Sequence, residues 1–262
     1  EANKNLLSVS EDVYVPGAYF LTTQKILQEQ YVSDFGRPKG NLCSIKSSEN
    51  YQCTFMKQTT CGESLRAIQF QKGTAYFASC MMGCHYKEAK KQFLDAVESI
   101  TNFSYFLAES KYAGKIKPRE LLVIDEAHNV ELELSKFIEI TISEKFASSV
   151  LKLQWPTSLT EKSVIKWITD VYRPKLLNHI EHIKSMLEKF TGLKEKLNEL
   201  TGFSKQYSLL DKHVCKINRF LEIFSEENWA LNTIDANGKS MRKIEFKPID
   251  ISIYSEDSLF KF

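Results

Sequence analysis

Long apolar runs and an excess of one charge are both missing from the sequence. No stretch approaches the roughly 20 consecutive apolar residues that a membrane-spanning helix needs, and the polar segment that opens at Glu1 is unlike a signal peptide. We therefore expect a soluble protein of the cytoplasm, or of the nucleus in a eukaryote, with no membrane partner. The 35 basic and 33 acidic residues leave a net charge of only +2, so any binding of nucleic acid has to be local.

A complete phosphate-binding loop is also missing. That loop has the pattern Gly-x4-Gly-Lys-Ser/Thr, and the Gly-Lys-Ser sequence at 238–240 has Thr233 where the first glycine should stand. Asn237-Gly238 instead predicts the turn of a β-hairpin. The chain begins without a methionine, and both of its ends fall inside patterned sequence. We expect it to be part of a longer protein.

The residues that are present suit a globular protein, since 43% are hydrophobic and 12% aromatic. The most informative segment is the apolar run 121–124, which leads directly into Asp125, Glu126, Ala127 and His128. Such a run predicts a strand that is covered on both faces, as in a parallel α/β sheet, where ligands bind beyond the carboxyl ends of the strands.

Two adjacent carboxylates at a strand end suit nucleotide hydrolysis. In that chemistry Asp125 would hold Mg²⁺, while Glu126 would polarise the attacking water. His128 could hydrogen-bond toward a neighbouring motif and report the nucleotide state. The alternative is that the acidic pair only caps a helix.

Other segments also fit α/β architecture. Residues 18–21 predict a strand, and Thr22 and Thr23 are suited to cap the helix that follows it. At such a position hydroxyl and backbone N–H groups can also hold a nucleic-acid phosphate. A further short strand is expected around Ile100.

Beyond residue 143 the pattern becomes helical. Apolar residues at helical spacing predict one helix from Pro174 to Gly202 and a second over 207–224, packed together as a hairpin. Residues 229–246 then predict two short strands joined at Asn237-Gly238.

Five of the six cysteines lie between positions 43 and 84, in a stretch with no sustained periodicity. In an intracellular protein, clustered cysteines indicate metal ligands or buried thiols rather than disulfides. A bound metal could organise a stretch that has few apolar residues. A structural zinc would use the same thiolates. Cys215 is expected to be a core residue of a helix.

Several of these segments together resemble the superfamily 2 iron–sulfur DNA helicases of the XPD and DinG type. The segment Val-Ile-Asp-Glu-Ala-His-Asn-Val-Glu at 123–131 is similar to the family's motif II. The other matches, in family order, are the motif Ia-like stretch at 21–30, Lys-Gly-Asn-Leu-Cys at 39–43, Cys-His-Tyr-Lys-Glu-Ala at 84–89 and Thr-Asn-Phe-Ser-Tyr-Phe-Leu at 101–107. Two departures are the missing arginine of the segment before Cys43, and His85 where the family has proline.

The resemblance implies an ATP-dependent DNA helicase that moves 5′→3′ on single-stranded or forked DNA with Mg-ATP. It implies catalytic roles for Asp125, Glu126 and His128, with Asp125 on the magnesium ion. It implies DNA contacts from Thr22, Thr23 and Gln24. It also implies a 4Fe–4S cluster on Cys43, Cys53, Cys61 and Cys84, with Cys80 as the substitute.

The resemblance also implies a domain plan that begins in the first RecA-like motor lobe. That lobe would contain 1–36 and 91–143, with the iron–sulfur domain at 37–90, a helical Arch-like domain at 144–228, and a hairpin returning to the lobe at 229–262. The chain would then end just before motif III, without the phosphate loop or the second lobe. We expect such a piece to be inactive alone, and the Arch to bind a protein partner. The alternative is a non-catalytic, metal-stapled module that binds DNA or protein through its helical hairpin.

Overall fold

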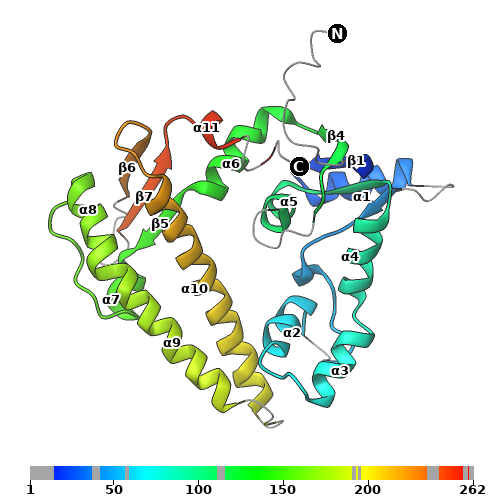
Figure 1. Cartoon of the computed structure of the whole chain (residues 1–262), viewed down its shortest axis with the longest axis horizontal. Coiled ribbons are helices and arrows are strands. Elements are labelled where there is room, and N and C mark those ends of the chain that lie inside the picture. The colour runs from blue at the N-terminus through cyan, green and yellow to red at the C-terminus, as the bar shows by residue number, and fades with distance from the viewer. Residues whose placement is uncertain are drawn as a thin grey trace. The chain divides into compact units, whose positions relative to one another are not determined.

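The computed structural model describes residues 15–36, 42–56, 59–110, 116–190, 193, 196–234, 242–255 and 259. The chain divides into two compact units (Figure 1). The parallel-sheet unit is formed by residues 1–46, 87–130 and 254–262, and the helical unit by residues 47–86 and 131–253. The predicted Asn237-Gly238 turn lies outside the described residues.

The parallel-sheet unit has four strands, all parallel, in the order β2-β3-β1-β4. This confirms the predicted α/β class with a parallel sheet. The strands are β1 (Val15–Thr22), β2 (Leu42–Ser44), β3 (Glu98–Asn102) and β4 (Arg119–Ile124), and the helices are α1 (Lys25–Phe35), α4 (His85–Asp95) and α5 (Phe103–Ala108). Tyr19 on the central strand packs against Phe93 of α4 and Phe106 of α5.

A buried arginine joins the amino ends of these strands. Arg119 is 4% exposed, and its guanidinium lies 4.0 Å from the ring centre of Tyr19. The guanidinium donates to the carbonyl oxygens of Ala18, Phe93, Leu94 and Val97 and to the hydroxyl of Ser99. One side chain therefore ties β1, β3 and β4 to the end of α4.

A glycine is required beside this arginine. Gly17 has a φ of +128°, and a Cβ on it would meet the Val97 carbonyl oxygen at 2.1 Å. That oxygen accepts from the Ala18 N–H and from Arg119. The close approach coincides with the register shift between Val15 and Ala18 in the β1–β4 pairing.

Two predictions about local structure in this unit are wrong. Among the described strands β4 lies at the edge of the sheet, and its residues are not covered on both faces, since Leu121 is 54% exposed. The Thr22-Thr23 pair does not cap α1, because the residue before the helix is Gln24, whose side chain makes no capping hydrogen bond. Thr22 instead donates to the Gln24 carbonyl oxygen.

The cysteine-rich part of the helical unit is more regular than its sequence suggests. It contains two eight-residue helices, α2 (Cys61–Ile68) and α3 (Ala75–Met82). Thr60 and Glu63 form a reciprocal capping box at the start of α2, and Thr74 caps α3. Helices of about two turns contain too few residues for a visible apolar period, so their caps are the better signal.

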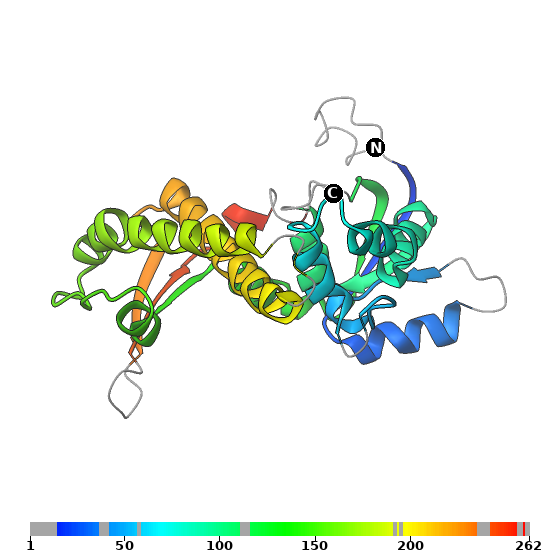
Figure 2. The same ribbon diagram turned by 90° about the horizontal axis from the view of Figure 1, so that it is seen from below.

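The larger part of the helical unit combines a helix pair with a three-stranded antiparallel sheet, ordered β5-β7-β6. The long helices α9 and α10 run side by side (Figure 1, Figure 2). Phe220 of α10 packs against Trp229 and Phe246 of the sheet. The elements are α6 (Val130–Ile138), β5 (Ile140–Ser143), α7 (Glu144–Ser149), α8 (Glu161–Trp167), a π-helical turn (Ile168–Tyr172), α9 (Arg173–Lys189), α10 (Leu197–Ile223), β6 (Trp229–Ile234), β7 (Lys243–Pro248) and α11 (Ser252–Ser255).

The helical hairpin and the two terminal strands are found, but the predicted division of the hairpin is wrong. The first helix ends at Lys189, and the second begins at Leu197 and continues through Gly202. A Cβ at Gly202 would meet nothing within 4 Å, so this glycine marks no close contact. The apolar residues at 197 and 200 fit the helical spacing of either helix. Periodicity alone therefore cannot show where the first helix ends and the second begins. β5, which was not predicted, pairs with β7.

A partly buried hydrogen bond joins α10 to the π-helical turn. The Tyr172 hydroxyl lies 3.0 Å from Nε2 of His213. Burial, and then the positive charge of Lys216, lowers the pKa of His213 to about 4. Burial raises the pKa of Tyr172. The pair is therefore neutral at physiological pH.

We expect Arg119→Met to lower the free energy of unfolding by roughly 3 kcal/mol or more, because it leaves several buried carbonyl groups without their donor. Urea denaturation followed by circular dichroism measures the change. Lys117→Met, on the exposed neighbouring residue, is the control and should change stability by less than about 0.5 kcal/mol. Equal effects of the two substitutions would contradict this role of Arg119.

Acid should destabilise the helical unit through His213. Below pH 6.5 the unfolded chain binds a proton at this residue, whereas the folded chain does not do so until about pH 4. Stability should therefore fall between these values by up to about 3 kcal/mol. His213→Gln keeps an acceptor for Tyr172 and should remove this part of the pH dependence in thermal melts. His182→Gln, on the exposed side of α9, should retain it.

Candidate functional site

The carboxyl edge of the parallel sheet brings the two predicted motor motifs together. Thr22 of β1 pairs with Asn102 of β3, and Leu21 pairs with Ile124 of β4. The Asp125 N–H then donates to the Leu21 carbonyl oxygen at 2.9 Å. The motif Ia-like turn and the Asp-Glu-Ala-His turn therefore leave adjacent strands side by side.

The acidic turn holds its two carboxylates in different surroundings. Asp125 is half-buried, and Glu126 and His128 are exposed. Glu126 has left-handed backbone angles, φ 56° and ψ 48°. Nδ1 of His128 lies 3.2 Å from the Glu126 carboxylate, and Nε2 lies 3.1 Å from the Asn129 amide nitrogen. Glu126, His128 and Asn129 form a short polar chain that faces solvent.

A residue that the sequence analysis did not single out contacts Asp125. Tyr31 of α1 hydrogen-bonds to the Asp125 side chain. Burial, and then the charge and hydrogen bond of Asp125, raise the pKa of Tyr31, and the charge of Glu126 adds to this. Tyr31 was expected only on the apolar side of its helix. Tyr31 lies about two helical turns after Gln24 and so on the same side of the helix, and this spacing was the signal in the sequence for a place near the site.

The motif Ia residues divide into buried and accessible ones. Thr22 is fully buried and shapes the turn, whereas Thr23 is half-buried and Gln24 is exposed. Gln28, which sequence reasoning did not assign, is also fully buried. Its amide donates to the carbonyl oxygens of Ile45 and Ile100, at 2.8 Å and 3.4 Å, and so fixes α1 against the sheet.

Of the five cysteines in the helical unit, four are buried: Cys53, Cys61, Cys80 and Cys84. Cys215 on α10 is exposed, so the prediction that it is a core residue is wrong. The sulfur atoms of Cys61 and Cys84 are 3.5 Å apart. Burial, and then the hydrogen bond with Cys84, raise the pKa of the Cys61 thiol to about 12. The Cys61 thiol is therefore protonated at physiological pH, and a metal would have to displace its proton on binding.

Hydrogen-bond groups surround these sulfur atoms. The Met56 N–H donates to Cys53 at 3.2 Å, and a backbone hydrogen bond from Tyr86 reaches Cys61. The Ser64 hydroxyl lies 3.0 Å from the Cys53 sulfur. Donors of this kind stabilise thiolates and tune thiolate-bound metals. The chemistry of the donors fits a metal with thiolate ligands.

The four thiols do not stand in a metal-binding arrangement. Across the described residues, no group of three or more His, Cys, Asp or Glu side chains is placed to hold a metal ion. Binding would require the Cys61–Cys84 contact to open. Cys43, the other predicted ligand, belongs to the parallel-sheet unit, where it pairs with Ser99.

Burial lowers the pKa of the Arg119 guanidinium. Electrostatic interactions with the nearby Tyr19 and Cys43 act in the opposite direction and raise it.

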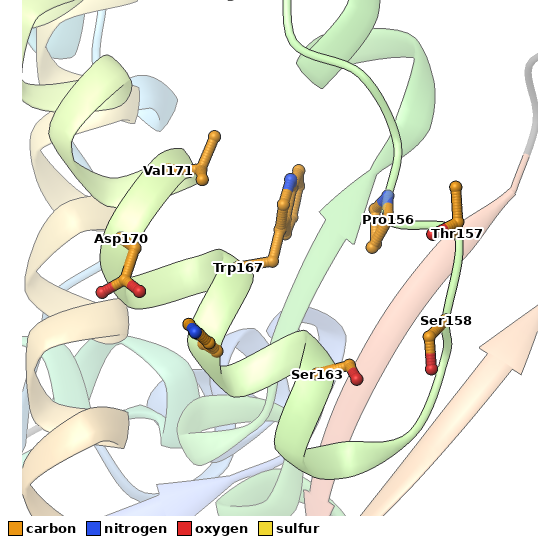
Figure 3. Close-up of a pocket in the computed structure, with 8 residues that line it drawn as sticks. Pro156, Thr157, Ser158, Ser163, Trp167, Asp170 and Val171 are labelled. Carbon is orange, nitrogen blue, oxygen red and sulfur yellow. The ribbon is translucent and has the colours of Figure 1, made fainter.

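Of three cavities among the described residues, none is lined by Asp125, Glu126 or His128. One of about 420 Å³ is at the amino ends of the strands, lined by Tyr19 and Arg119 among others. One of about 370 Å³ lies in the helical unit, where Trp167 points toward Pro156 and the loop that follows it (Figure 3). A third, of about 340 Å³, also borders α8, and shares Lys166 and Asp170 with the second.

Comparison with known proteins adds no assignment. No family model and no curated protein matches the chain. Within the part of the chain that the structure describes, no helix is both long enough and apolar enough to cross a membrane. The geometry of the two sites therefore carries the functional argument.

The left-handed backbone of Glu126 costs about 1 kcal/mol for a residue with a Cβ. We therefore expect Glu126→Gly to be more stable than Glu126→Ala by about that amount. Both variants lose the exposed contact with His128, so their difference isolates the backbone term. Thermal or urea denaturation of the two variants measures it, and equal stabilities would refute the strain.

Proposed function

We propose that the chain is part of an ATP-dependent DNA helicase of the XPD and DinG type. The observation that carries the proposal is the hydrogen bond from the Asp125 N–H to the Leu21 carbonyl oxygen. Through it, an acidic turn suited to nucleotide hydrolysis adjoins a turn suited to phosphate-backbone contact, at the sheet edge where α/β proteins bind ligands. A structural change at one turn can therefore be transmitted to the other turn through this single backbone hydrogen bond.

In this proposal Asp125 binds Mg²⁺, and Tyr31 orients its carboxylate. Glu126 polarises the water that attacks the γ-phosphate. His128, 3.2 Å from Glu126, couples that carboxylate to neighbouring motifs. A metal ion held there would supply charge neutralisation on the phosphates.

The DNA-binding role rests on the accessible part of the motif Ia turn. Thr23 and Gln24 contact the phosphate backbone of the single strand, and the buried Thr22 keeps their turn in shape. The phosphate loop and the second motor lobe come from other parts of the full-length protein. Movement 5′→3′ is proposed from the resemblance to the family.

The other regions take their roles from the same family plan. In that plan residues 1–36 and 91–143 belong to motor lobe 1, residues 37–90 form the iron–sulfur domain, residues 144–228 form the Arch-type insertion, and residues 229–262 return to the lobe. The thiols of the helical unit would hold the 4Fe–4S cluster, and the bound cluster would brace a region with a small apolar core. The surrounding N–H and hydroxyl groups stabilise the thiolates.

A protein partner of the helical unit is a second candidate function. Cavities of about 370 and 340 Å³ flank α8, and Trp167 lines the larger one. The adjoining π-helical turn (Ile168–Tyr172) is a form often found at functional sites. Loss of partner capture on Trp167→Ala, with the fold intact, would support docking at this surface.

The full-length protein tests the helicase proposal. We expect single-stranded DNA to stimulate its ATPase, and Glu126→Gln to lower kcat by about 10²-fold or more, since general-base catalysis is lost. Glu131→Gln, an exposed glutamate in the following helix, is the matched control and should leave kcat unchanged. A wild-type protein without DNA-stimulated ATPase, or a fully active Glu126→Gln variant, would overturn the proposal.

A further inference from the structure

We infer that the cavity at the amino ends of the parallel strands is a binding site for a small carboxylate with an apolar body. The cavity has a volume of about 420 Å³, which is within the range of small-molecule sites. It belongs to the parallel-sheet unit and is lined by Val15, Tyr19, Leu94, Asp95, Lys117 and Arg119. None of these residues has a role in the proposed nucleotide or DNA sites.

Arg119 gives the cavity a buried cation without a counter-anion among the described residues. Its guanidinium donates only to neutral groups, namely four carbonyl oxygens and the Ser99 hydroxyl. Burial lowers its pKa, and the groups that oppose this are the phenol of Tyr19 and the thiol of Cys43 rather than a carboxylate. Buried charges are normally paired, because an unpaired charge is costly to bury. An anion in the cavity would stabilise the charged guanidinium.

Two hydrogen-bond donors in this wall have no acceptor within the part of the chain that the structure describes. The bonds of Arg119 use its two terminal nitrogens, which leaves its Nε–H unpaired. Tyr19 is 2% exposed, yet its hydroxyl has no hydrogen-bond partner. Both residues line the cavity, and neither atom is fully enclosed. Burial raises the pKa of Tyr19 against the opposing charge of Arg119, so the phenol keeps its proton and can donate to an anion.

The charge of the wall favours an anion with a single negative charge. Lys117 and Asp95 are exposed at the cavity, and neither forms an ion pair with another described residue. Together with Arg119 they give the wall a net charge of +1. One carboxylate balances this charge, whereas a phosphate monoester, with a charge of about −1.5 to −2 at neutral pH, would leave excess negative charge beside Asp95. Val15 and Leu94 provide apolar surface for the body of the ligand.

The sheet and its packing hold this wall in place. Arg119 is in register with Val15 in the pairing of β4 with β1, and its guanidinium lies 4.0 Å from the ring centre of Tyr19. The Tyr19 ring also packs against Phe93 of α4, the helix that ends at Asp95 beside the cavity. A ligand would therefore meet groups that are already fixed, and preorganisation of this kind lowers the entropic cost of binding.

An NMR titration of the isotope-labelled 262-residue chain tests the site. The probes are acetate, isovalerate and hydrocinnamate, each compared with its neutral amide. We expect at least one carboxylate to bind in the millimolar range and to shift the backbone signals of Leu94 and Lys117. The matching amide should bind at least about tenfold more weakly, because hydrogen bonds to a charged acceptor are stronger than those to a neutral one.

Single substitutions in the wall should change carboxylate binding in opposite directions. Lys117→Gln should weaken it by about threefold or more, whereas Asp95→Asn should strengthen it by about two- to threefold, because a like charge is removed. Tyr19→Phe should weaken it by about threefold or more, since a donor is lost. Lys91→Gln, on an exposed lysine of α4 that does not line the cavity, is the matched control and should bind as the wild type does.

Three results would each overturn the inference: no carboxylate binding at this cavity, an amide that binds as tightly as its carboxylate, or equal affinities of the Lys117→Gln and Lys91→Gln variants. Lys117 and Asp95 are exposed, so their variants decide the matter even if Tyr19→Phe fails to fold. The inference does not depend on the helicase proposal, and the titration and the ATPase measurement can fail independently of each other.

Discussion

The parallel-sheet unit depends on the buried guanidinium of Arg119. A cation that is 4% exposed would be strongly destabilising without partners. Here four backbone carbonyl oxygens and the Ser99 hydroxyl surround it. The same bonds fix the amino ends of β1, β3 and β4, so the carboxyl ends of these strands emerge in register. Gly17 allows this arrangement, because any side chain at this position would collide with the Val97 carbonyl group.

The two ends of the sheet have opposite characters. At the amino end both terminal nitrogens of Arg119 donate to groups within the fold, and the side chain is buried. At the carboxyl end Glu126 has a strained backbone, and Glu126 and His128 face solvent. Backbone strain lowers stability and is commonly retained at functional sites. This contrast favours the acidic turn as the place where chemistry occurs.

The sequence predicts the elements with strong patterns and fails where neighbouring elements decide. The run at 121–124 predicted β4, yet only the sheet order makes it an edge strand. Gly202 suggested a helix end, whereas α10 continues through it because a helix interior tolerates one glycine at a cost of about 1 kcal/mol. The sequence could name Asp125, Glu126 and His128 as candidate site residues because they directly follow one strand. Tyr31 and Gln28 were not, since their roles arise from contacts with distant segments.

The parallel pairing of β2 with β3 has a consequence for how the chain folds. Residues 45–97 separate the two strands, and closing a loop of that length costs conformational entropy before any strand contact forms. Much of this loop is organised by its own local contacts: the capping box of α2, the closed turn from 52 to 60 and the Thr54–Gly83 bond. A loop that is already folded locally costs less conformational entropy to close, as a shorter loop does. Early folding of the cysteine-rich stretch would therefore speed the docking of β2 and make assembly of the sheet less prone to mispairing.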